Sequence, residues 1–356
     1  MTEGDRFADW GKVPARLLLA ALLALLVASA LVQIGIGAKT IATPGFGTAA
    51  PEKTRDNDLA VYDRAVERIR GGENYYDFIV AEHRRADFPV RPGLAVRLPT
   101  LAYLNAALGD TGQAVAAIAL MLAVLVAWWR RLGTEPGGRA VRPLAMALLF
   151  VGCSLGANRY FFQLHEMWSG MLLALAFGLH RPGKWAAALV VSALALAIRE
   201  QALPFVLLMA AMAAWRRDWR EAAAWQALAL VFALGLAWHL SVIAQQTVPS
   251  DGVSSSWLAL RGLTGWLSNV VLSSNLRFLP HWLAGPLVVL MTFGWAGWRS
   301  DAGLTGTLLY TGYAAAFLLA GRNDNYYWGA MIAPALFIGL AFAPLALRSL
   351  CKAAIR

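Results

Sequence analysis

The amino-acid sequence predicts an all-α polytopic membrane protein with about ten transmembrane helices, folded as a single transmembrane domain over residues 1–356. The chain is 59% hydrophobic and only 15% charged, whereas soluble domains carry roughly 25% charged residues. Apolar runs close to the ~20 residues needed to cross a bilayer recur along the chain. Short turns separate these runs, and every second turn is rich in Lys and Arg.

The net charge of +10 follows from this arrangement. In a soluble protein such an excess would suggest nucleic-acid binding, but Lys and Arg also gather at the cytoplasmic ends of membrane spans. We therefore expect a lipid bilayer and no nucleic acid as partner. The basic turns predict a multi-pass membrane protein with both the N- and C-termini in the cytoplasm.

The first span is predicted at residues 17–38, which is too long for the core of a cleaved signal peptide. Arg6, Lys12 and Arg16 precede it and anchor its cytoplasmic end. The further spans are predicted at residues 113–129, 143–157, 167–179, 185–198, 202–215, 222–243, 282–298, 304–320 and 329–347.

Two longer segments are expected outside the membrane, at residues 39–97 and 245–280. The first contains a predicted amphipathic helix at residues 57–70, which Gly71 and Gly72 end. Its apolar side chains recur at helical spacing and predict a helix lying on the outer membrane surface. They are Leu59, Tyr62, Val66 and Ile69.

Six carboxylates lie between residues 55 and 77. Asp56 and Asp58 are each suited to cap the start of helix 57–70, because a short acidic side chain accepts hydrogen bonds from first-turn N–H groups. Only one residue can occupy the cap, which leaves one carboxylate near the membrane surface. The other four are expected to form a solvated, salt-bridged face: Asp63, Glu67, Glu73 and Asp77.

Polar and charged residues also lie at the external ends of the predicted spans. A charge at membrane depth costs roughly 2.5–3.5 kcal/mol, so such residues are functional candidates by default. Local ion pairing or interfacial anchoring would explain them equally simply. The opposite turns are predicted to hold only basic anchors. The external candidates are Arg159, His165, Glu166, Arg199, Glu200, Arg322, Asn325, Tyr326 and Tyr327.

The stretch NDLAVYDRAVERIRGGENYYD, residues 57–77, resembles the first external loop of GT-C superfamily glycosyltransferases that use polyprenyl-phosphate sugars, the mannosyltransferase- and arabinosyltransferase-like members included. The family pattern places an Asp, a Tyr four residues later, a small-residue helix, a Gly-Gly turn and a Tyr-Asp pair. Asp58, Tyr62, Ala65, Gly71-Gly72 and Tyr76-Asp77 match it. The family's later Tyr-Pro-Pro segment is replaced here by PVRP, residues 89–92.

The resemblance implies a GT-C-like fold, a lipid-linked sugar donor and an active site on the periplasmic face of the bacterial inner (plasma) membrane. Asp58 takes the family's catalytic acidic position, with Asp56 in reserve. A carboxylate can remove the proton of an acceptor hydroxyl, and arginines can stabilise a phosphate leaving group. We assign donor phosphate to Arg199, Arg322 and, third, Arg159. The expected sugar and acceptor contacts are His165, Glu166, Glu200, Tyr62, Asn325, Tyr326 and Tyr327.

No nucleotide-binding motif appears in the sequence, and no cofactor or metal site is expected, although a metal requirement stays open. The acceptor is a glycan, a lipid or a protein. Three alternatives remain: a transporter or flippase of a lipid-linked glycan, a non-catalytic membrane assembly subunit, and another polyprenyl-phosphate enzyme such as a ligase. A transporter would place charged groups in the cytoplasmic half of the spans.

Overall fold

A computed structural model describes residues 5–35 and 57–356, and this part of the chain is helical, with isolated bridges in place of β-strands. The α-helices are α1 Lys12–Leu31, α2 Asn57–Arg70, α3 Tyr75–Arg85, α4 Thr100–Leu132, α5 Gly138–Cys153, α6 His165–Leu179, α7 Ala186–Ile198, α8 Leu203–Trp215, α9 Trp219–Gln246, α10 Gly262–Leu272, α11 His281–Gly297, α12 Asp301–Leu319, α13 Ala333–Leu336 and α14 Ile338–Ile355. The 3-10 segments are η1 Gly93–Ala95, η2 Ser154–Ala157, η3 Arg159–Phe161, η4 Glu200–Ala202, η5 Asn275–Phe278 and η6 Asn323–Met331.

Six helical stretches in the described residues are long and apolar enough to cross a membrane, which supports a multi-pass helical membrane protein. They are Lys12–Leu31, Gly93–Leu132, Gly138–Ala157, Trp219–Gln246, Asp301–Leu319 and Ala333–Ile355. The other predicted spans also coincide with helices, but α6, α7, α8 and α11 have only 13–17 residues. The predicted number of about ten spans is therefore not established.

Several span boundaries differ from the prediction, and α4 begins at Thr100, thirteen residues before the predicted start of the second span at residue 113. Helix α1 ends at Leu31, seven residues before the predicted end of the first span. Gly35 lies four residues beyond this end, and glycine is among the weakest helix formers. The last predicted span begins instead with the 3-10 segment η6, and α14 continues to Ile355.

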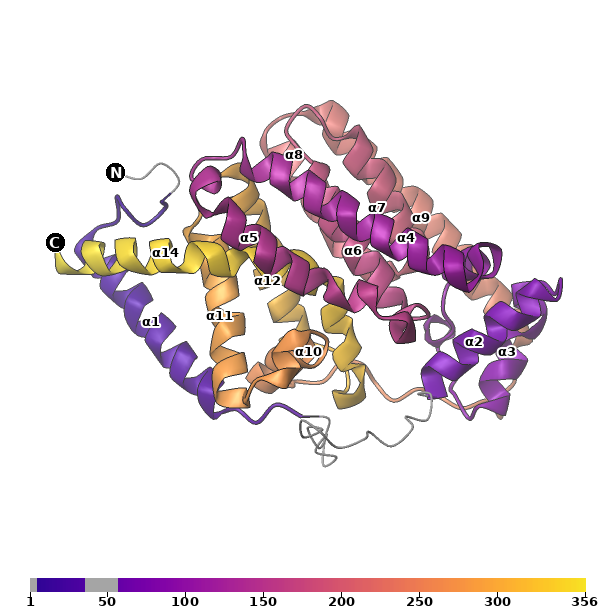
Figure 1. Cartoon of the computed structure of the whole chain (residues 1–356). Coiled ribbons are helices and arrows are strands. Elements are labelled where there is room, and N and C mark those ends of the chain that lie inside the picture. The colour runs from indigo at the N-terminus through magenta and orange to yellow at the C-terminus, as the bar shows by residue number, and fades with distance from the viewer. Residues whose placement is uncertain (1–4, 36–56) are drawn as a thin grey trace.

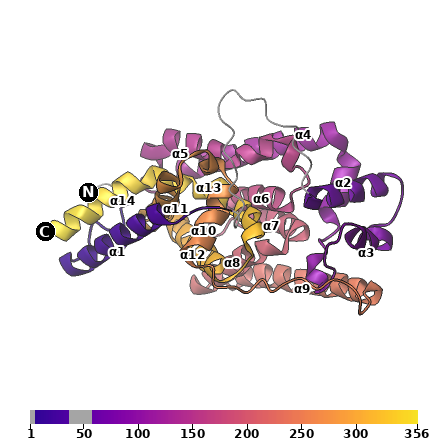
Figure 2. The same ribbon diagram turned by 90° about the horizontal axis from the view of Figure 1, so that it is seen from below.

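The helices form two packed groups (Figure 1). Helices α1, α11 and α14 pack together near the N-terminus, and α4 and α6–α9 form the other group. Helix α12 contacts both α11 and α8, so it connects the two groups. Figure 2 shows α2 and α3 between the ends of α4 and α9, in agreement with their contacts. Helices α2 and α3 thus cap one end of the second group.

Helix α2 has the predicted bounds, and the glycine pair ends it as expected, with Gly72 at a φ of 92°. Its apolar side chains Leu59 and Val66 are buried. They are covered by the protein, since α2 packs on α3 and α4. The prediction that this face lies on the membrane surface is therefore wrong. Arg64 and Arg68 both pair with Glu82 of α3, which fixes the two helices together.

The second external segment has two different parts. Residues 247–261, which we call the strap, connect α9 to α10 without helical structure. Helix α10 follows and is largely buried inside the protein. Of the predicted second external segment, the strap alone is therefore an extended connection between helices.

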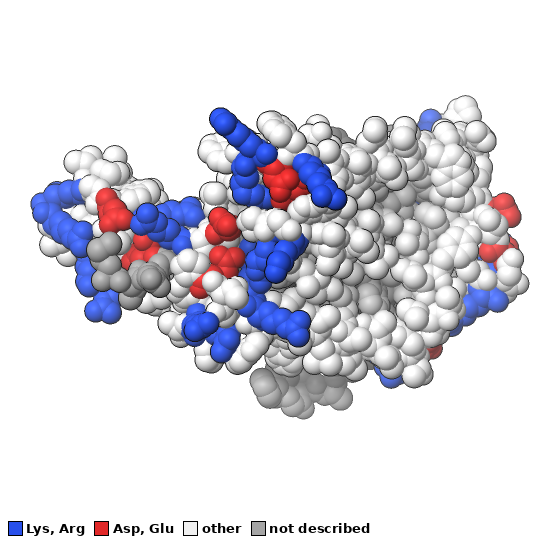
Figure 3. Space-filling model, turned by 90° about the horizontal axis from the view of Figure 1, so that it is seen from above, with Lys and Arg blue, Asp and Glu red and all other residues white. Residues whose placement is uncertain are grey.

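The end opposite α2 and α3 holds buried charges that the sequence analysis missed. Glu221 is fully buried, and its carboxylate lies 2.7 Å from His180 Nε2 and 2.9 Å from Arg216 Nη2. Arg131 is also buried and lies 3.0 Å from Glu135. The prediction that these turns hold only basic anchors is wrong, because neighbouring turns bring opposite charges together. Figure 3 shows the molecule from above relative to the view of Figure 1, and on this face Lys and Arg are more prominent than Asp and Glu.

Candidate functional site

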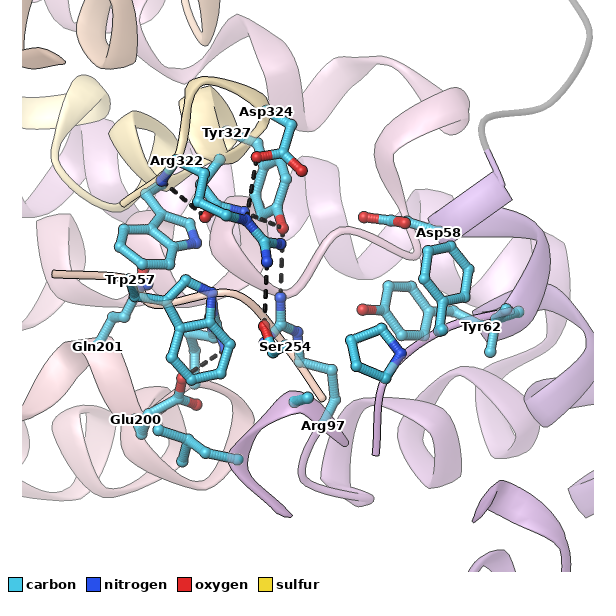
Figure 4. A pocket seen from close by; sticks show the side chains of 18 of the residues that line it. Asp58, Tyr62, Arg97, Glu200, Gln201, Ser254, Trp257, Arg322, Asp324 and Tyr327 are labelled. Carbon is cyan, nitrogen blue, oxygen red and sulfur yellow. Dashed lines mark hydrogen bonds and ion pairs between the residues drawn. The ribbon is translucent and has the colours of Figure 1, made fainter. Parts of the chain in front are cut away.

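A cavity of about 400 Å³ lies where α2, the strap and η6 meet (Figure 4). Segments distant in the sequence contribute its walls: α2, residues 83–97, the start of η4 and α8, the strap, and η6. Its polar and aromatic lining residues are Asp58, Tyr62, His83, Phe88, Arg97, Arg199, Glu200, Gln201, Ser254, Trp257, Arg322, Asp324, Asn325, Tyr327 and Trp328. Seven predicted site residues therefore share one cavity: Asp58, Tyr62, Arg199, Glu200, Arg322, Asn325 and Tyr327.

Asp58 lies in the first turn of α2, where the helix dipole favours a carboxylate. Tyr62 follows one turn later, and burial raises the pKa of its hydroxyl, which therefore stays protonated. The Tyr62 ring packs edge-on against His165, with centroids 4.9 Å apart. Figure 4 shows Asp58 and Tyr62 on one side of the cavity and Arg97 and Arg322 across from them. Asp56 lies outside the described residues.

Arg97 was not predicted as a site residue. Its Nη2 donates to the Tyr327 hydroxyl at 3.4 Å, and it forms no ion pair with a carboxylate among the residues the structure describes. Its own carbonyl accepts from the Tyr75 hydroxyl at 2.7 Å, and the Val96 carbonyl lies 3.1 Å from His239 Nε2. The backbone of Arg97 is thus held at two points while its charge faces the cavity.

Arg199 reaches the cavity, but its charge is already paired. The side chain is 1% exposed, and its Nε lies 2.7 Å from Glu166 Oε1. That N–H does not point along the line to the oxygen, so the contact is an ion pair without hydrogen-bond geometry. Nη1 donates to Glu200 Oε1 at 2.5 Å. With the Gln201 amide oxygen turned inward, Arg199 Nη2 also donates to it at 3.2 Å.

Arg322 lies at the start of η6, and neutral groups hold most of it. Its Nη1 donates to the hydroxyls of Ser254 and Ser255 at 3.0 and 3.2 Å. Its Nε lies 3.3 Å from the exposed carboxylate of Asp324. Its backbone N–H donates to the Asn325 side chain at 3.0 Å, and Asn325 donates in turn to the Tyr327 hydroxyl at 3.2 Å. Tyr327 therefore stands between Arg322 and Arg97.

Close packing fixes η6 in this place. A Cβ added at Gly329 would lie 1.9 Å from the Asn269 carbonyl oxygen of α10, so only glycine allows this approach. Gly321 has a φ of 96°, a conformation that glycine adopts easily. These two glycines flank the segment that carries Arg322, Asn325 and Tyr327.

The remaining predicted site residues lie elsewhere. Arg159 is exposed on η3 and does not line the cavity. His165 and Glu166 are buried behind the cavity wall. Tyr326 does not line the cavity, and its ring lies 6.0 Å from that of Tyr327.

Three guanidinium groups and three carboxylates line the cavity. Over residues 5–35 and 57–356, no group of three or more His, Cys, Asp and Glu side chains is arranged to hold a metal ion. The arrangement can accept a proton at Asp58 and bind an anion across the cavity.

No protein-family model, curated protein or solved structure matches this chain.

Proposed function

We propose that this protein is a membrane glycosyltransferase of GT-C type, which moves a sugar from a polyprenyl phosphate to an acceptor hydroxyl. The observation that carries the proposal is the cavity itself, in which Asp58 faces Arg97 and Arg322. A carboxylate opposite cations suits a reaction that removes a proton on one side and releases a phosphate on the other.

In this mechanism Asp58 accepts the proton of the acceptor hydroxyl as its oxygen attacks the anomeric carbon. The bond between that carbon and the phosphate oxygen breaks, and its electron pair leaves with the polyprenyl phosphate. Arg97 and Arg322 stabilise the phosphate, which needs no protonation to depart. Glu166 and Glu200 already balance the charge of Arg199, so Arg199 holds these two carboxylates in place and does not bind the donor phosphate. We therefore revise the donor contacts to Arg97 and Arg322.

The size and surroundings of the cavity support a lipid-linked donor. A volume of about 400 Å³ is at the lower end of the roughly 300–1,000 Å³ typical of ligand sites, which suits a sugar and a phosphate without the tail. Apolar side chains on the neighbouring span α9, such as Leu234 and Trp238, are exposed and suit contact with acyl or polyprenyl chains.

The distribution of charge supports an outward-facing cavity. Basic side chains gather on the face seen in Figure 3, and basic turns stay in the cytoplasm. The cavity lies at the other ends of the helices, since α4 and α6 both begin beside it and end in that basic region. The proposed reaction therefore takes place on the periplasmic side of a bacterial inner membrane.

The decisive experiment compares Asp58→Asn with Glu67→Gln, an exposed carboxylate on the same helix. Purified protein is incubated with defined polyprenyl-phosphate sugars and candidate acceptors, and donor consumption is measured. Loss of a general base costs roughly 10²–10⁴-fold, so Asp58→Asn should lose transfer by that factor and keep its fold. Glu67→Gln should retain wild-type activity.

The same assay separates the alternatives. Full transfer by Asp58→Asn would refute Asp58 as the base. Absence of donor consumption by the wild-type protein with every polyprenyl-phosphate sugar and acceptor tested would refute the transferase. Movement of the intact lipid-linked sugar across vesicles would favour a transporter instead.

A further inference from the structure

The strap is clamped to the first external segment at its N-terminal half. Asp251 is buried on the strap, and its carboxylate accepts from Arg84 Nε and Nη2 at 2.7 and 2.9 Å. Arg91 Nη2 donates to the Asp251 carbonyl at 2.7 Å. The Ser254 N–H donates to the Arg91 carbonyl at 2.7 Å, and this backbone contact fixes the position of Ser254 beside the cavity.

The C-terminal half of the strap is held separately by the end of α12. The Gly321 N–H donates to the Trp257 carbonyl at 2.7 Å, and the Arg261 N–H donates to the Leu318 carbonyl at 2.8 Å. Ser254 and Ser255 lie between the two attachments, next to Arg322. Ser254 lines the cavity and Ser255 lies beside it against Arg322, and the backbone that carries both is bound on either side.

The hydroxyl groups of Ser254 and Ser255 are able to donate hydrogen bonds to a ligand. Both oxygens accept from Arg322 Nη1, so each O–H must point away from that nitrogen, and a hydroxyl can accept and donate at once. Among the residues that the structure describes, the Ser254 hydroxyl reaches only the Ser255 carbonyl as an acceptor, at 3.3 Å, and a charged acceptor forms the stronger bond. Arg322 Nη2 makes no hydrogen bond within the described part of the chain.

We propose that Ser254 and Ser255 complete a phosphate-binding site with Arg322, and that Asp251 positions them by clamping the strap. The inference rests on the proposed function and names further donors for the same phosphate. Several donors then converge from one side: the two hydroxyls and the Nη2 group of Arg322. A phosphate offers three or more oxygen atoms that match such a set.

The test measures binding of a sugar-free polyprenyl phosphate to the full-length protein in nanodiscs. Ser254→Ala and Ser255→Ala should each weaken binding about tenfold, the factor expected for a hydrogen bond to a charged group. Ser254→Thr, which keeps the hydroxyl, should restore binding at that position. Ser256→Ala is the matched control, because Ser256 does not contact Arg322, and it should bind as the wild type does.

Asp251→Ala tests the positioning role with a second measurement. Backbone amides of residues 252–257 should exchange faster with deuterated solvent, and phosphate binding should weaken together with this loss of order. Ser254→Ala should weaken binding without the faster exchange. If Asp251→Ala speeds exchange but leaves binding unchanged, the positioning role is wrong.

The outcomes separate this proposal from the proposed function. If Arg97→Gln and Arg322→Gln lose binding while both serine variants bind as the wild type does, the serine site is wrong and the transferase stands. Tighter binding by the serine variants would also overturn it, since the hydroxyls would then compete with phosphate for Arg322. If the wild-type protein binds no polyprenyl phosphate, both proposals fail.

Discussion

Two groups of buried charges lie at opposite ends of the helices and differ in how completely they are paired. At the basic end, the Glu221 carboxylate is 2.7 Å from His180 Nε2 and accepts from Arg216 and from the Trp225 indole N–H. At the cavity, the side chain of Arg97 has a tyrosine hydroxyl as its only hydrogen-bond partner among the described residues. Within the same part of the chain, the ring nitrogens of His83 have no partner of hydrogen-bond geometry, although the Pro89 carbonyl lies nearby.

This difference in pairing indicates that the Glu221 cluster is structural. The charges at the cavity, by contrast, would be completed by a bound ligand. Buried polar groups in folded proteins are nearly always hydrogen-bonded, so each exception needs an explanation. The Glu221 cluster provides its own partners and needs nothing else. Arg97 lines a cavity, and an anion there would supply the partner that it lacks. Each prediction below tests one side of this contrast.

The largest effect is expected from breaking the closed cluster. Glu221→Gln leaves Arg216 without its anion, and removing one partner of a buried pair costs about 3–5 kcal/mol. We expect a large loss of thermal stability, measured by the folded fraction after heating in detergent. Asp9→Asn is the control, because it breaks the exposed Arg299–Asp9 pair and such pairs contribute about 0–1 kcal/mol. Equal stability of the two variants would contradict the contrast.

His83 should make stability depend on pH. Burial lowers the pKa of His83 from 6.5 to about 4. The folded state therefore favours the neutral ring, and its contribution is full above pH 6.5 and is lost as the pH falls toward 4. The loss amounts to about 3 kcal/mol at 1.36 kcal/mol per pKa unit. Unfolding of His83→Leu between pH 7 and 4 should be less acid-sensitive than that of the wild type, and equal slopes would be inconsistent with this assignment.

Arg97→Gln should lower phosphate binding and leave the fold intact. A hydrogen bond to a charged group contributes about 1.5–3 kcal/mol, so affinity for polyprenyl phosphate should fall roughly 10- to 100-fold. The melting temperature should change little, because Arg97 has no ion-pair partner in the described residues to leave behind. Affinity is measured in nanodiscs and stability in the same preparation. Unchanged affinity would remove Arg97 from the site.

The smallest effect is expected at Arg159. The sequence marked it as a third phosphate ligand, but it is exposed on η3 outside the cavity. Arg159→Ala should change donor consumption by less than about twofold, since surface substitutions away from special features alter energies by about 0.5 kcal/mol or less. A tenfold loss would mean that the donor extends beyond the cavity.

The helical fold was predictable because apolar runs and glycine positions are local signals. Helix α2 follows its periodicity and ends at the glycine pair. The covering of its apolar face was not predictable, since a periodic stripe does not distinguish a membrane surface from α3 and α4. The shortness of α7 and α8, by contrast, was predictable, because Arg199 and Glu200 interrupt the apolar sequence between residues 185–198 and 202–215, and the turn there folds as η4.

The lining of the candidate site was predictable where a polar residue interrupts an apolar run, as with Arg199 and Glu200. Arg97 was missed because it stands between a loop and a span, where arginine is also the usual anchor. Ser254 was missed because a serine in a loop carries no signal until a neighbour such as Arg322 is in place. The sequence also does not reveal that Glu166 and Glu200 already balance the charge of Arg199. This ion pairing decides whether Arg199 is available to bind an anion.

The cavity draws its walls from positions as distant as Asp58 and Trp328. Since chains are synthesised and inserted from the N-terminus, Asp58 leaves the ribosome long before η6 exists. Tyr62 and Arg97 are therefore made before the part of the cavity wall that η6 forms. That part forms only when α10 is in place and Gly329 packs against Asn269. The candidate catalytic carboxylate is thus made well before the η6 wall of its cavity. A chain whose synthesis has not yet reached η6 therefore carries no assembled site.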